Sequence, residues 1–351
     1  MRRSTSNGTL ERWNGGTWSS ATFLAAICLS IFPSFRLSVF DLSAQEIATN
    51  AGALFLLFPV GAQAVAMGQT AAALEGRGEA AFWNPAGLAT IDHAELAFNT
   101  ASLAAGATHA LTAYFPSHGF GVLGGALYLV DYGDLERTDS ANNTIARVAP
   151  RNIEFLASYA TELAGSVTLG INYKLVEFVV DCSGDCTNFP NGHGVTHALD
   201  IGGQFAVGRS GALRVGVAVR NVGFKLQVNN RELADPLPAR LVVGAAYRVL
   251  LPGGSGLGGG EDRLDLKVAA DVDSPWGSYG DSEMRVGIDL GYQRLLRLRG
   301  GYAFVRDGLS GPSVGMGLRS GSIGVDLARA FLTGSDLVAQ NPTFFSFRVV
   351  F

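Results

Sequence analysis

The sequence predicts an all-β fold: a transmembrane outer-membrane β-barrel of about fourteen antiparallel strands, with a small N-terminal plug that contains a short helix. Three observations support this prediction. Short segments of alternating polarity follow one another from residue 94 to the C-terminus. Past the N-terminus, no apolar run reaches the about 18 residues of a spanning helix. The 351 residues are 48% hydrophobic but only 16% charged, which suits either a large β core or a barrel in lipid.

The N-terminus has the order of a signal peptide: basic residues first, then an apolar segment over 21–32, then small residues near 42–44. We therefore expect residues 1–44 to be removed on export, leaving a plug, or hatch, over 45–93 and a barrel over 94–351. Export combined with a barrel indicates the bacterial outer membrane.

The segment before the first strand has no period-2 pattern. Its small residues from Gly61 to Leu74 predict a short, closely packed helix, which Gly76 and Gly78 then break. A compact apolar segment that precedes a long run of strands is best placed inside them. The candidate residues of this segment form one motif: Phe82, Trp83, Asn84, Pro85, Ala86 and Gly87. Proline disfavours helix at the residue before it, so the backbone at this motif should be extended or turned.

The barrel segments are each roughly 8–12 residues long, the length that crosses an outer membrane at a tilt. They are 94–102, 107–115, 119–130, 150–160, 166–180, 197–207, 212–221, 239–249, 263–272, 284–292, 296–305, 312–319, 322–330 and 344–351. An even number of strands is expected of a closed bacterial barrel.

The connections alternate in length. Most odd-numbered ones are long, as at 131–149 and 222–238, whereas most even-numbered ones are short turns, as at 116–118. The glycine-rich connection 252–260 is the exception, because it is long on the short side. A barrel with extracellular loops and periplasmic turns explains the alternation, and a soluble sandwich does not.

Within the later strands, one face is apolar and the other mixes charge with Gly and Ala. A sandwich could show the same pattern with its apolar face inward, but the signal peptide, loop alternation and strand length together favour the barrel. The inward charges are then Arg214, Arg220, Asp265, Lys267, Asp271, Arg285, Asp289, Arg297 and Arg299. Since both signs are interleaved, we interpret them as a ladder of cross-strand pairs; a selectivity lining for a solute path is the alternative.

The last strand carries an aromatic face. Phe345, Phe347, Val349 and Phe351 lie on one side of it, and the chain ends on phenylalanine. A free apolar edge strand invites aggregation, so we expect this strand to close the barrel against the first. A terminal aromatic strand resembles the assembly signal of outer-membrane barrels.

Two motifs resemble a known family. The run from Gly61 through Met67-Gly68 to Trp83-Asn84-Pro85-Ala86-Gly87-Leu88-Ala89 resembles the N-terminal hatch of FadL-like outer-membrane barrels, and more closely that of the PorV/PorQ subgroup. This chain has Gln63 where that pattern has Arg, and Gln69 where it has Gly.

The second motif lies in a predicted loop and its flanks, with the candidate residues Asn221, Gly223, Pro236, Leu237 and Pro238. PorV/PorQ-like sequences carry Asn-Leu-Gly and then Pro-Leu-Pro before the next strand. The two prolines should stiffen a surface loop and deny it strand pairing.

Cys182 and Cys186 fall in a predicted extracellular loop. An oxidising compartment makes a small disulfide the leading interpretation. His193 and His197 follow, so a zinc site is an alternative, although the intervening residues are loop-like and offer no helix. Two free thiols, or a crosslink elsewhere, remain open.

Other chemistry is not indicated. Residues 254–259 fit Gly-x-Gly-x-x-Gly, but a strand rather than a helix follows, so we expect a flexible turn and no nucleotide. We discern neither a nucleophile arrangement nor a carboxylate pair, and we expect no enzyme, cofactor or metal. A net charge of -4 without a basic face argues against a nucleic-acid partner.

Three functions remain. The PorV/PorQ resemblance implies a surface role with type IX secretion, in which extracellular loops engage exported proteins or secretion-system subunits. The wider FadL-like resemblance implies passive uptake of hydrophobic small molecules such as fatty acids, although a lumen lined with charge and small residues disfavours an apolar ligand. A scaffold barrel without transport is the third. Outer-membrane lipid is a partner in every case.

Overall fold

The computed structural model describes residues 52–351 except 105, 164, 188–191, 209, 228–233, 252–263, 294, 306–307 and 335–340. The predicted signal peptide, the first residues of the predicted plug and the glycine-rich connection therefore lie outside the described residues. Among those that are described, no helix is long and apolar enough to cross a membrane.

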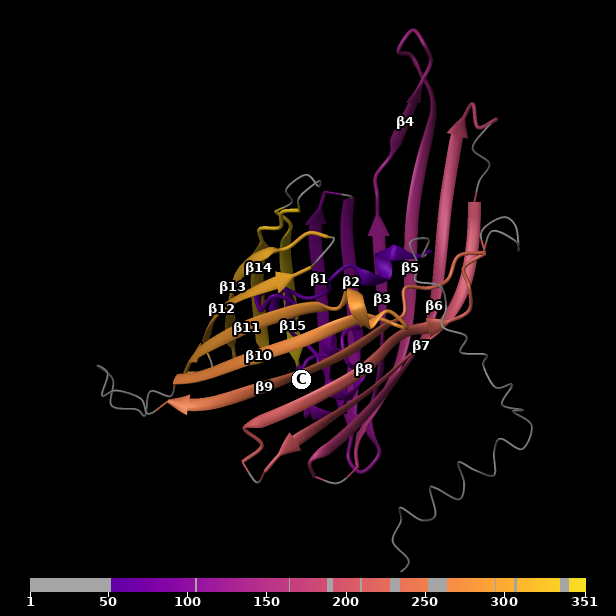
Figure 1. The fold of residues 1–351 in the computed structure, drawn as a ribbon. Coiled ribbons are helices and arrows are strands. Elements are labelled where there is room, and N and C mark those ends of the chain that lie inside the picture. Colours follow the sequence, from indigo (N-terminus) through magenta and orange to yellow (C-terminus); the bar gives the residue numbers. More distant parts are fainter. Residues whose placement is uncertain are drawn as a thin grey trace, which may run out of the picture. The chain divides into compact units, whose positions relative to one another are not determined.

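Residues 95–350 form a closed antiparallel β-barrel of 14 strands (Figure 1). The strands are β1 (Glu95–Leu103), β2 (Gly106–Ser117), β3 (Gly121–Asp131), β5 (Thr144–Glu162), β6 (Val167–Gly184), β7 (Gly192–Val207), β8 (Leu213–Gly223), β9 (Arg240–Leu251), β10 (Leu264–Pro275), β11 (Glu283–Tyr292), β12 (Leu296–Phe304), β13 (Gly311–Ser320), β14 (Ile323–Ala330) and β15 (Thr343–Val350). Closure comes from β15 pairing with β1, from Glu95 opposite Val350 to Ser102 opposite Thr343.

The predicted strands are confirmed, and so is closure of the last strand on the first. The sequence prediction was wrong at one end of these strands: it began β5 at 150 and β7 at 197, ended β6 at 180, and treated 131–149 as a loop. A short strand, β4 (Leu135–Thr138), pairs there with the start of β5, and β5 and β6 pair with each other out to Ala146 opposite Gly184. These strands extend beyond their neighbours at one end of the barrel (Figure 1). The polarity pattern fades there because most side chains of β4, of the start of β5 and of the end of β6 are exposed or half-buried.

The two ends of the barrel differ in their connections. The turn end carries the short turns at 118–120, 293–295 and 321–322, together with the C-terminus. The loop end carries the long connections and the extension formed by β4, β5 and β6.

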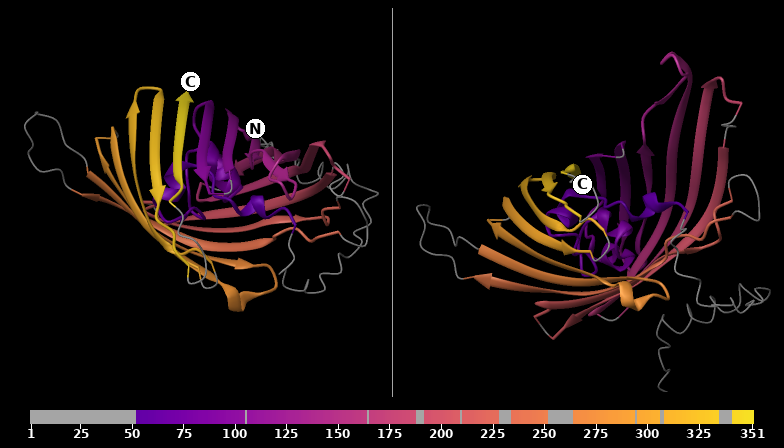
Figure 2. Two further views of the ribbon diagram at one scale, coloured as in Figure 1. Left: turned by 90° about the horizontal axis from the view of Figure 1, so that it is seen from above. Right: turned by 45° about the horizontal axis from the view of Figure 1, so that its top comes forward.

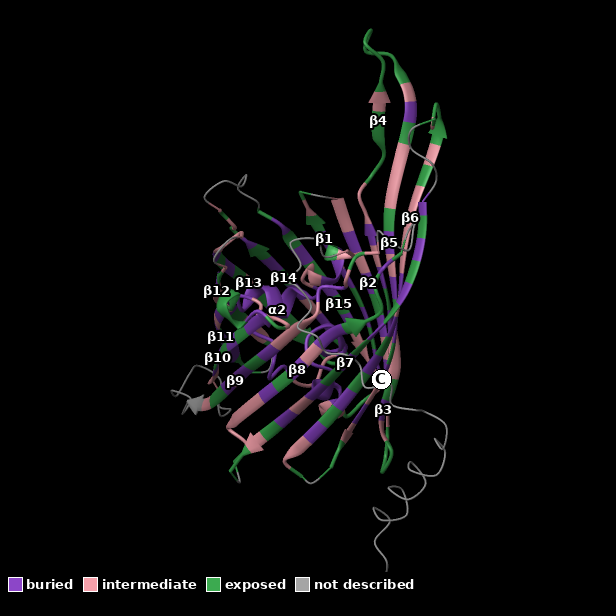
Figure 3. Cartoon of the chain, turned by 45° about the vertical axis from the view of Figure 1, so that its right-hand side comes forward, coloured by how far each residue is buried: buried purple, intermediate pink, exposed green. Residues whose placement is uncertain are grey.

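The alternation of side chains fixes which face meets lipid. Along β10 and β11, Val268, Val272 and Ile288 point outward and are exposed, whereas Lys267 and Asp289 point inward and are buried. Figure 3 shows the same alternation as bands along the strands. Apolar side chains outside and polar or small ones inside are the pattern of a barrel in a membrane, and the opposite of a soluble sandwich core.

The plug lies on the inner side of the barrel wall (Figure 2). Its elements are the 3-10 helices η1 (Leu54–Leu57), η2 (Gly78–Phe82) and η3 (Pro85–Thr90) and the α-helix α2 (Ala62–Ala66). α2 packs on β12–β15, and η3 packs on β5–β7. One further 3-10 helix, η5 (Tyr279–Asp281), lies in the loop between β10 and β11.

The predicted helix over 61–74 is shorter than expected. It ends after Ala66 because Gly68 and Gln69 both adopt left-handed backbone, with φ of 67° and 66°. The chain then turns back through Thr70, whose hydroxyl donates to the Met67 carbonyl at 2.8 Å. A run of small residues allows helix but does not require it, and here docking on the wall decides the backbone.

Glycines on the inward face of the wall receive the plug. At each, an added Cβ would lie less than 3.0 Å from a plug atom. These positions are Gly170, Gly202, Gly216, Gly287, Gly301 and Gly315. The plug therefore contacts wall backbone directly, and the lumen has no room for larger side chains at these points. This explains glycines scattered within strands, for which the sequence suggested no reason.

Candidate functional site

The plug and the wall that surrounds it form the candidate functional site. The side chain of Asn84 forms hydrogen bonds to both of them. Its side chain is 0% exposed, and Nδ2 donates to the carbonyl of Ala72 at 2.6 Å and to the wall carbonyls of Gly203 and Val217 at 3.3 and 3.4 Å. Oδ1 accepts from the Ala86 amide at 3.1 Å, which caps η3. The amide thus ties two plug segments to strands β7 and β8.

The other motif residues are placed around this amide. Asn84 has the predicted extended backbone, and Pro85 opens η3, where its missing N–H costs nothing. Ala86 is fully buried, and an added Cβ on Gly87 would clash with the Leu74 carbonyl. The motif therefore serves close packing of the plug.

Phe82 and Trp83 lie in an apolar cluster on the loop side of the plug. Phe82 meets Tyr128 of β3 edge-on at 5.7 Å between ring centres, and Phe55 stacks on the same ring at 6.3 Å. The Trp83 indole donates to the Val60 carbonyl at 2.9 Å. This cluster continues along the inner faces of β3, β5 and β6 with Val130, Leu156 and Val176.

The expectation of a lumen lined by charge and small residues therefore holds for only part of the wall. It fits the inner face from β8 to β15. On β3, β5 and β6 the inner face is mixed, because apolar side chains such as Tyr128, Leu156 and Val176 alternate with polar ones such as Glu154 and Lys174. The later strands carried the clear alternation, so the sequence analysis rested on them. Applying the same parity to 119–130 would have found Tyr128 on the inner face.

A buried ion network borders the apolar cluster. Lys174 of β6 lies 3.1 Å from Glu154 and 2.9 Å from Asp200, with all three side chains almost fully buried. A β-bulge in the pairing of β7 with β8 brings Asp200 close to Asn221. The backbone N–H of Asn221 donates to the Asp200 carboxylate at 2.7 Å. The sequence analysis missed this triad, although its members occupy inward positions of β5, β6 and β7.

Asn221 uses a left-handed backbone, with φ of 59°, to fit the bulge. Its Oδ1 accepts from Lys174 at 2.8 Å, and its Nδ2 donates to the Pro238 carbonyl at 3.2 Å. Asparagine tolerates this conformation better than most residues. The loop motif therefore joins the wall to the ion network.

The prediction of an exposed, stiffened loop at Pro236–Pro238 was wrong. Leu237 and Pro238 are buried, and the Pro236 carbonyl accepts from the Gly52 amide of the plug at 2.9 Å. Leu237 joins the apolar cluster of Phe55 and Leu56. Burial of its side chain is worth about 1.5–3 kcal/mol, which favours an inward position over water. Gly223, at the end of β8, packs against the His197 carbonyl of β7.

The predicted inward charges all point into the lumen, where they are paired or bound to the plug. Arg299 bridges Asp289 at 3.0 Å and Asp326 at 2.6 Å, and Arg220 and Arg285 share Asp273 at 3.2 Å each. Arg297 lies 3.0 Å from Asp265. Asp271 instead accepts from the plug amides of Ala71 and Ala72 at 2.6 and 2.8 Å.

The plug segment Glu75–Arg77 is held by charge. Glu75 lies 2.7 Å from Arg214 and 3.8 Å from Lys267, and Arg77 lies 2.5 Å from Asp326. These plug contacts were not predicted, because Glu75 and Arg77 stand outside any strand and no periodicity marks their partners.

Glu79 is a buried carboxylic acid in the plug, and its Oε1 has no hydrogen-bond partner. Loss of hydration raises its pKa to about 7, against the opposing attraction of Arg77. Because the folded-state pKa is raised, the folded state binds the proton more tightly than the unfolded state. The contribution of the protonated Glu79 to the free energy of unfolding is therefore complete below pH 4.5. This contribution is lost as the pH rises through about 7.

We expect Glu79→Gln to remove this share of the pH dependence. Between pH 5 and 8, wild-type stability should fall relative to the variant by up to about 3 kcal/mol, since each pKa unit is worth about 1.4 kcal/mol. Thermal unfolding of the detergent-solubilised barrel across this range measures the difference. Glu162→Gln, at an exposed turn, is the matched control, and parallel curves for wild type and Glu79→Gln would contradict the assignment.

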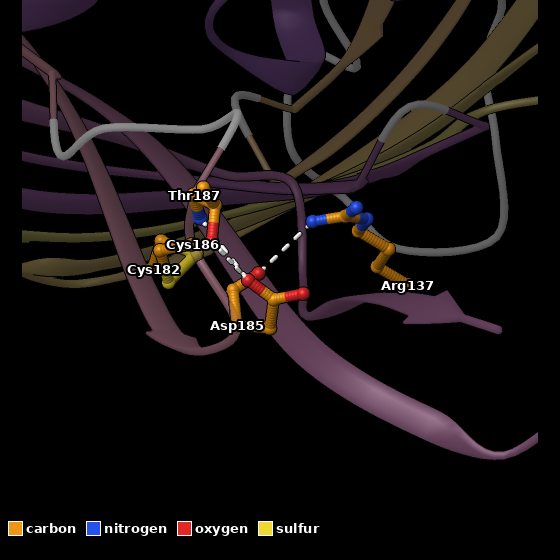
Figure 4. The surroundings of a disulfide bond; sticks show 5 residues. All are labelled: Arg137, Cys182, Asp185, Cys186 and Thr187. Carbon is orange, nitrogen blue, oxygen red and sulfur yellow. Dashed lines mark hydrogen bonds between the residues drawn. A yellow bond between two sulfur atoms is a disulfide. The ribbon is translucent and has the colours of Figure 1, made fainter.

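Cys182 and Cys186 form a disulfide near the tip of β6, with Cα atoms 6.0 Å apart (Figure 4). Beside it, Thr187 donates to the Asp185 carboxylate, and Arg137 donates to the Asp185 carbonyl at 3.0 Å. His193 instead contacts Glu177 at 2.6 Å, and His197 contacts the Tyr173 hydroxyl at 2.6 Å. In the described part of the chain, no group of three or more His, Cys, Asp or Glu residues could hold a metal ion.

The lumen is nearly filled at the apolar cluster of the plug. Beside Phe82 and Trp83, the remaining void is about 10 Å³, bordered by Phe58, Tyr128 and the Lys174 network. Such a space admits about one water molecule. Passage of any larger molecule therefore requires part of the plug to move.

Fold and site together define a transmembrane β-barrel of the outer-membrane type, closed by an N-terminal plug. No protein-family model and no curated protein matches the sequence. Solved structures share its fold. The toluene transporter TbuX of Ralstonia pickettii is 16% identical, with a TM-score of 0.50 over 83% of this chain and 98% of that one.

Two more solved structures match in the same way. The monoaromatic hydrocarbon channel CymD is 16% identical, with a TM-score of 0.53 over 83% of this chain and 97% of that one. The toluene transporter TodX of Pseudomonas putida is 14% identical, with a TM-score of 0.51 over 83% and 96%. These matches support a FadL-like barrel fold, and they do not confirm the PorV/PorQ resemblance.

Proposed function

We propose that this protein is an outer-membrane channel for the passive uptake of hydrophobic small molecules, with the plug as its gate. The observation that carries the proposal is the apolar cluster of the plug and of β3, β5 and β6, enclosed at the loop end of a barrel. The fold is shared with proteins described as toluene transporters and a monoaromatic hydrocarbon channel, which supports this function over secretion.

The apolar cluster supplies the physical basis. A small hydrophobic molecule that enters it leaves water and gains about 25 cal/mol per Å² of buried apolar surface. Since the present void is only about 10 Å³, Phe82 or Trp83 must move to admit such a molecule. Glu154 and Lys174 of the ion network border one side of the void, and a hydrophobic molecule would avoid that side because desolvating charges is costly.

Uptake by whole cells tests this function, because hydrocarbons cross a simple bilayer without help. We expect expression of this chain to raise uptake of radiolabelled toluene in a host that lacks its own hydrocarbon channels. Trp83→Ala should weaken binding of toluene about tenfold, the loss expected for one ring contact of about 1.5 kcal/mol. Trp276→Ala, in the loop after β10, is the matched control.

Uptake that is no faster than in cells without the barrel would count against this function. Equal toluene binding by wild type and Trp83→Ala would exclude the apolar cluster as the site. The folded fraction of each variant is measured first, from its mobility on gels before and after heating.

Engagement of exported proteins is a second candidate, favoured by the extension of β4, β5 and β6. Among the described strands, β4 pairs with β5 alone, so its outer edge is free to receive another strand. Replacing 134–143 by a short turn should then release attached exported proteins from the cell surface. Normal attachment would exclude this role. The connection 222–238 is unsuitable for such a deletion, because Leu226 and Leu237 within it pack in the apolar cluster with plug residues.

A further inference from the structure

We propose that the turn end of the barrel holds a binding site for a small oxyanion that carries two or more negative charges. The site is a cavity of about 260 Å³ between the plug and strands β9–β15. On the plug side, Gln63 and the segment Glu75–Arg77 line it. This inference does not depend on the uptake of hydrophobic molecules.

The charges that line the cavity do not cancel. Seven of its side chains are cationic: Arg77, Arg248, Lys267, Arg297, Arg299, Arg319 and Arg348. Three are acidic: Glu75, Asp289 and Asp326. From outside the lining, Glu95 and Asp265 pair with Arg348 and Arg297, and Arg214 pairs with Glu75, which gives five acids against eight cations. The nearby Glu79 offsets less than a full charge at neutral pH, because burial raises its pKa to about 7.

Glu75 shows the shortage of acids most directly. This one carboxylate faces three cations, Arg214 at 2.7 Å, Arg248 at 3.5 Å and Lys267 at 3.8 Å. The Lys267 side chain is only 9% exposed, so water does little to stabilise its charge. An anion in the cavity would supply the missing negative charge.

One buried donor without a partner faces the same space: the Nε of Arg348 makes no described hydrogen bond. The buried Gln63 has an unpaired Oε1, but this oxygen is an acceptor and does not itself attract an anion. Arg319 lines the cavity and forms no ion pair within the ranges that the structure describes. Buried donors are normally satisfied, so the unmet Arg348 Nε beside a cavity rich in cations indicates a missing anion.

The lining also selects the class of ligand. Leu295 and Leu318 are the only large apolar side chains among the described residues that line the cavity, so a hydrocarbon gains little there. Guanidinium groups bind carboxylate and phosphate through paired N–H donors. The size of the cavity suits inorganic phosphate or a short dicarboxylate. Such an anion would contact Arg77 of the plug together with the wall.

Isothermal titration calorimetry of the full barrel in non-ionic detergent at low salt tests the site. Inorganic phosphate, succinate and chloride are the three probes. We expect saturable binding of phosphate or succinate at one site, and chloride should not compete at equal concentration. Arg319→Gln removes an exposed cation without breaking an ion pair, and it should weaken binding about tenfold.

Gln63→Glu is the second variant, because it keeps the side-chain size and adds a negative charge inside the cavity. It should abolish binding. Arg329→Gln removes one positive charge at the loop end and should bind as wild type does. No saturable binding of either oxyanion overturns the proposal. Equal competition by chloride, or unchanged affinity in both Arg319→Gln and Gln63→Glu, overturns it as well.

Discussion

Replacing Gly301 by alanine is expected to unseat the plug while the barrel still forms. Gly301 of β12 pairs with Gly287 of β11, and the plug backbone at Met67 and Gly68 lies directly on both. A Cβ at Gly301 would come within 3.0 Å of three plug backbone atoms, which cannot move aside as a flexible side chain can. Overpacking costs about 1–3 kcal/mol, and rigid backbone neighbours place this case near the upper value.

Limited trypsin digestion measures the displacement. In the seated plug, Arg77 is held by Asp326 at 2.5 Å and its side chain is largely buried, so cleavage after it should be slow. In Gly301→Ala, cleavage after Arg77 should become fast, and the barrel should conduct ions in a planar bilayer. The β-sheet signal in circular dichroism should stay unchanged, because the wall pairing does not need the plug.

The adjacent Gly300 is the matched control. It lies on the same strand and faces the other way, and an added Cβ there meets nothing closer than 3.9 Å. Gly300→Ala should digest and conduct as wild type does. If Gly301→Ala also behaves as wild type, the plug does not rest on this part of the wall.

Asn84→Asp is expected to lower the unfolding free energy by more than about 3 kcal/mol. The substitution replaces a buried NH2 donor by a carboxylate oxygen, which cannot donate to the carbonyl oxygens around it. The Asn84 Nδ2 group lies close to the carbonyls of Ala72, Gly203 and Val217. A carboxylate would face these same three oxygens, and no described ion pair supplies a cation. Denaturant unfolding of the detergent-solubilised barrel gives the free-energy difference.

Asn142→Asp is the control for this substitution. Asn142 lies at the exposed tip of the β4–β5 connection, and a surface change of this kind stays within about 0.5 kcal/mol. A loss for Asn84→Asp as small as that of the control would show that the amide donor does not fix the plug. Asn84→Leu, which removes both donor and acceptor, should fall between the two because it buries no charge.

Much of the wall could be predicted because each strand carries its own signal. A strand in a membrane barrel must present alternate side chains to lipid and lumen. The sequence of the strand alone therefore shows which residues belong to each face. The same logic placed Phe345 and Phe347 on one face, where the structure exposes them outward on β15. Strand ends at the loop end were less certain, because β4 and the ends of β5 and β6 leave the membrane-facing zone and lose the pattern.

The candidate site was predictable only in part. The Asn84 motif was found because proline and small residues constrain the backbone locally. Its hydrogen bonds to β7 and β8, and the contacts of Glu75 and Arg77 with β8 and β14, join residues more than a hundred positions apart. Such pairs follow from how the sheet closes, and no spacing in the sequence encodes them.

The sequence by itself determined the strand number, the direction of each face and the presence of an inserted plug, because these depend on local polarity and backbone preference. Only the tertiary structure decided that wall glycines receive plug backbone, that Leu237 folds inward, and that cations outnumber acids at the turn end. The physical reason is that close packing and charge balance are properties of the closed lumen, where distant segments meet in a small volume from which most water is excluded.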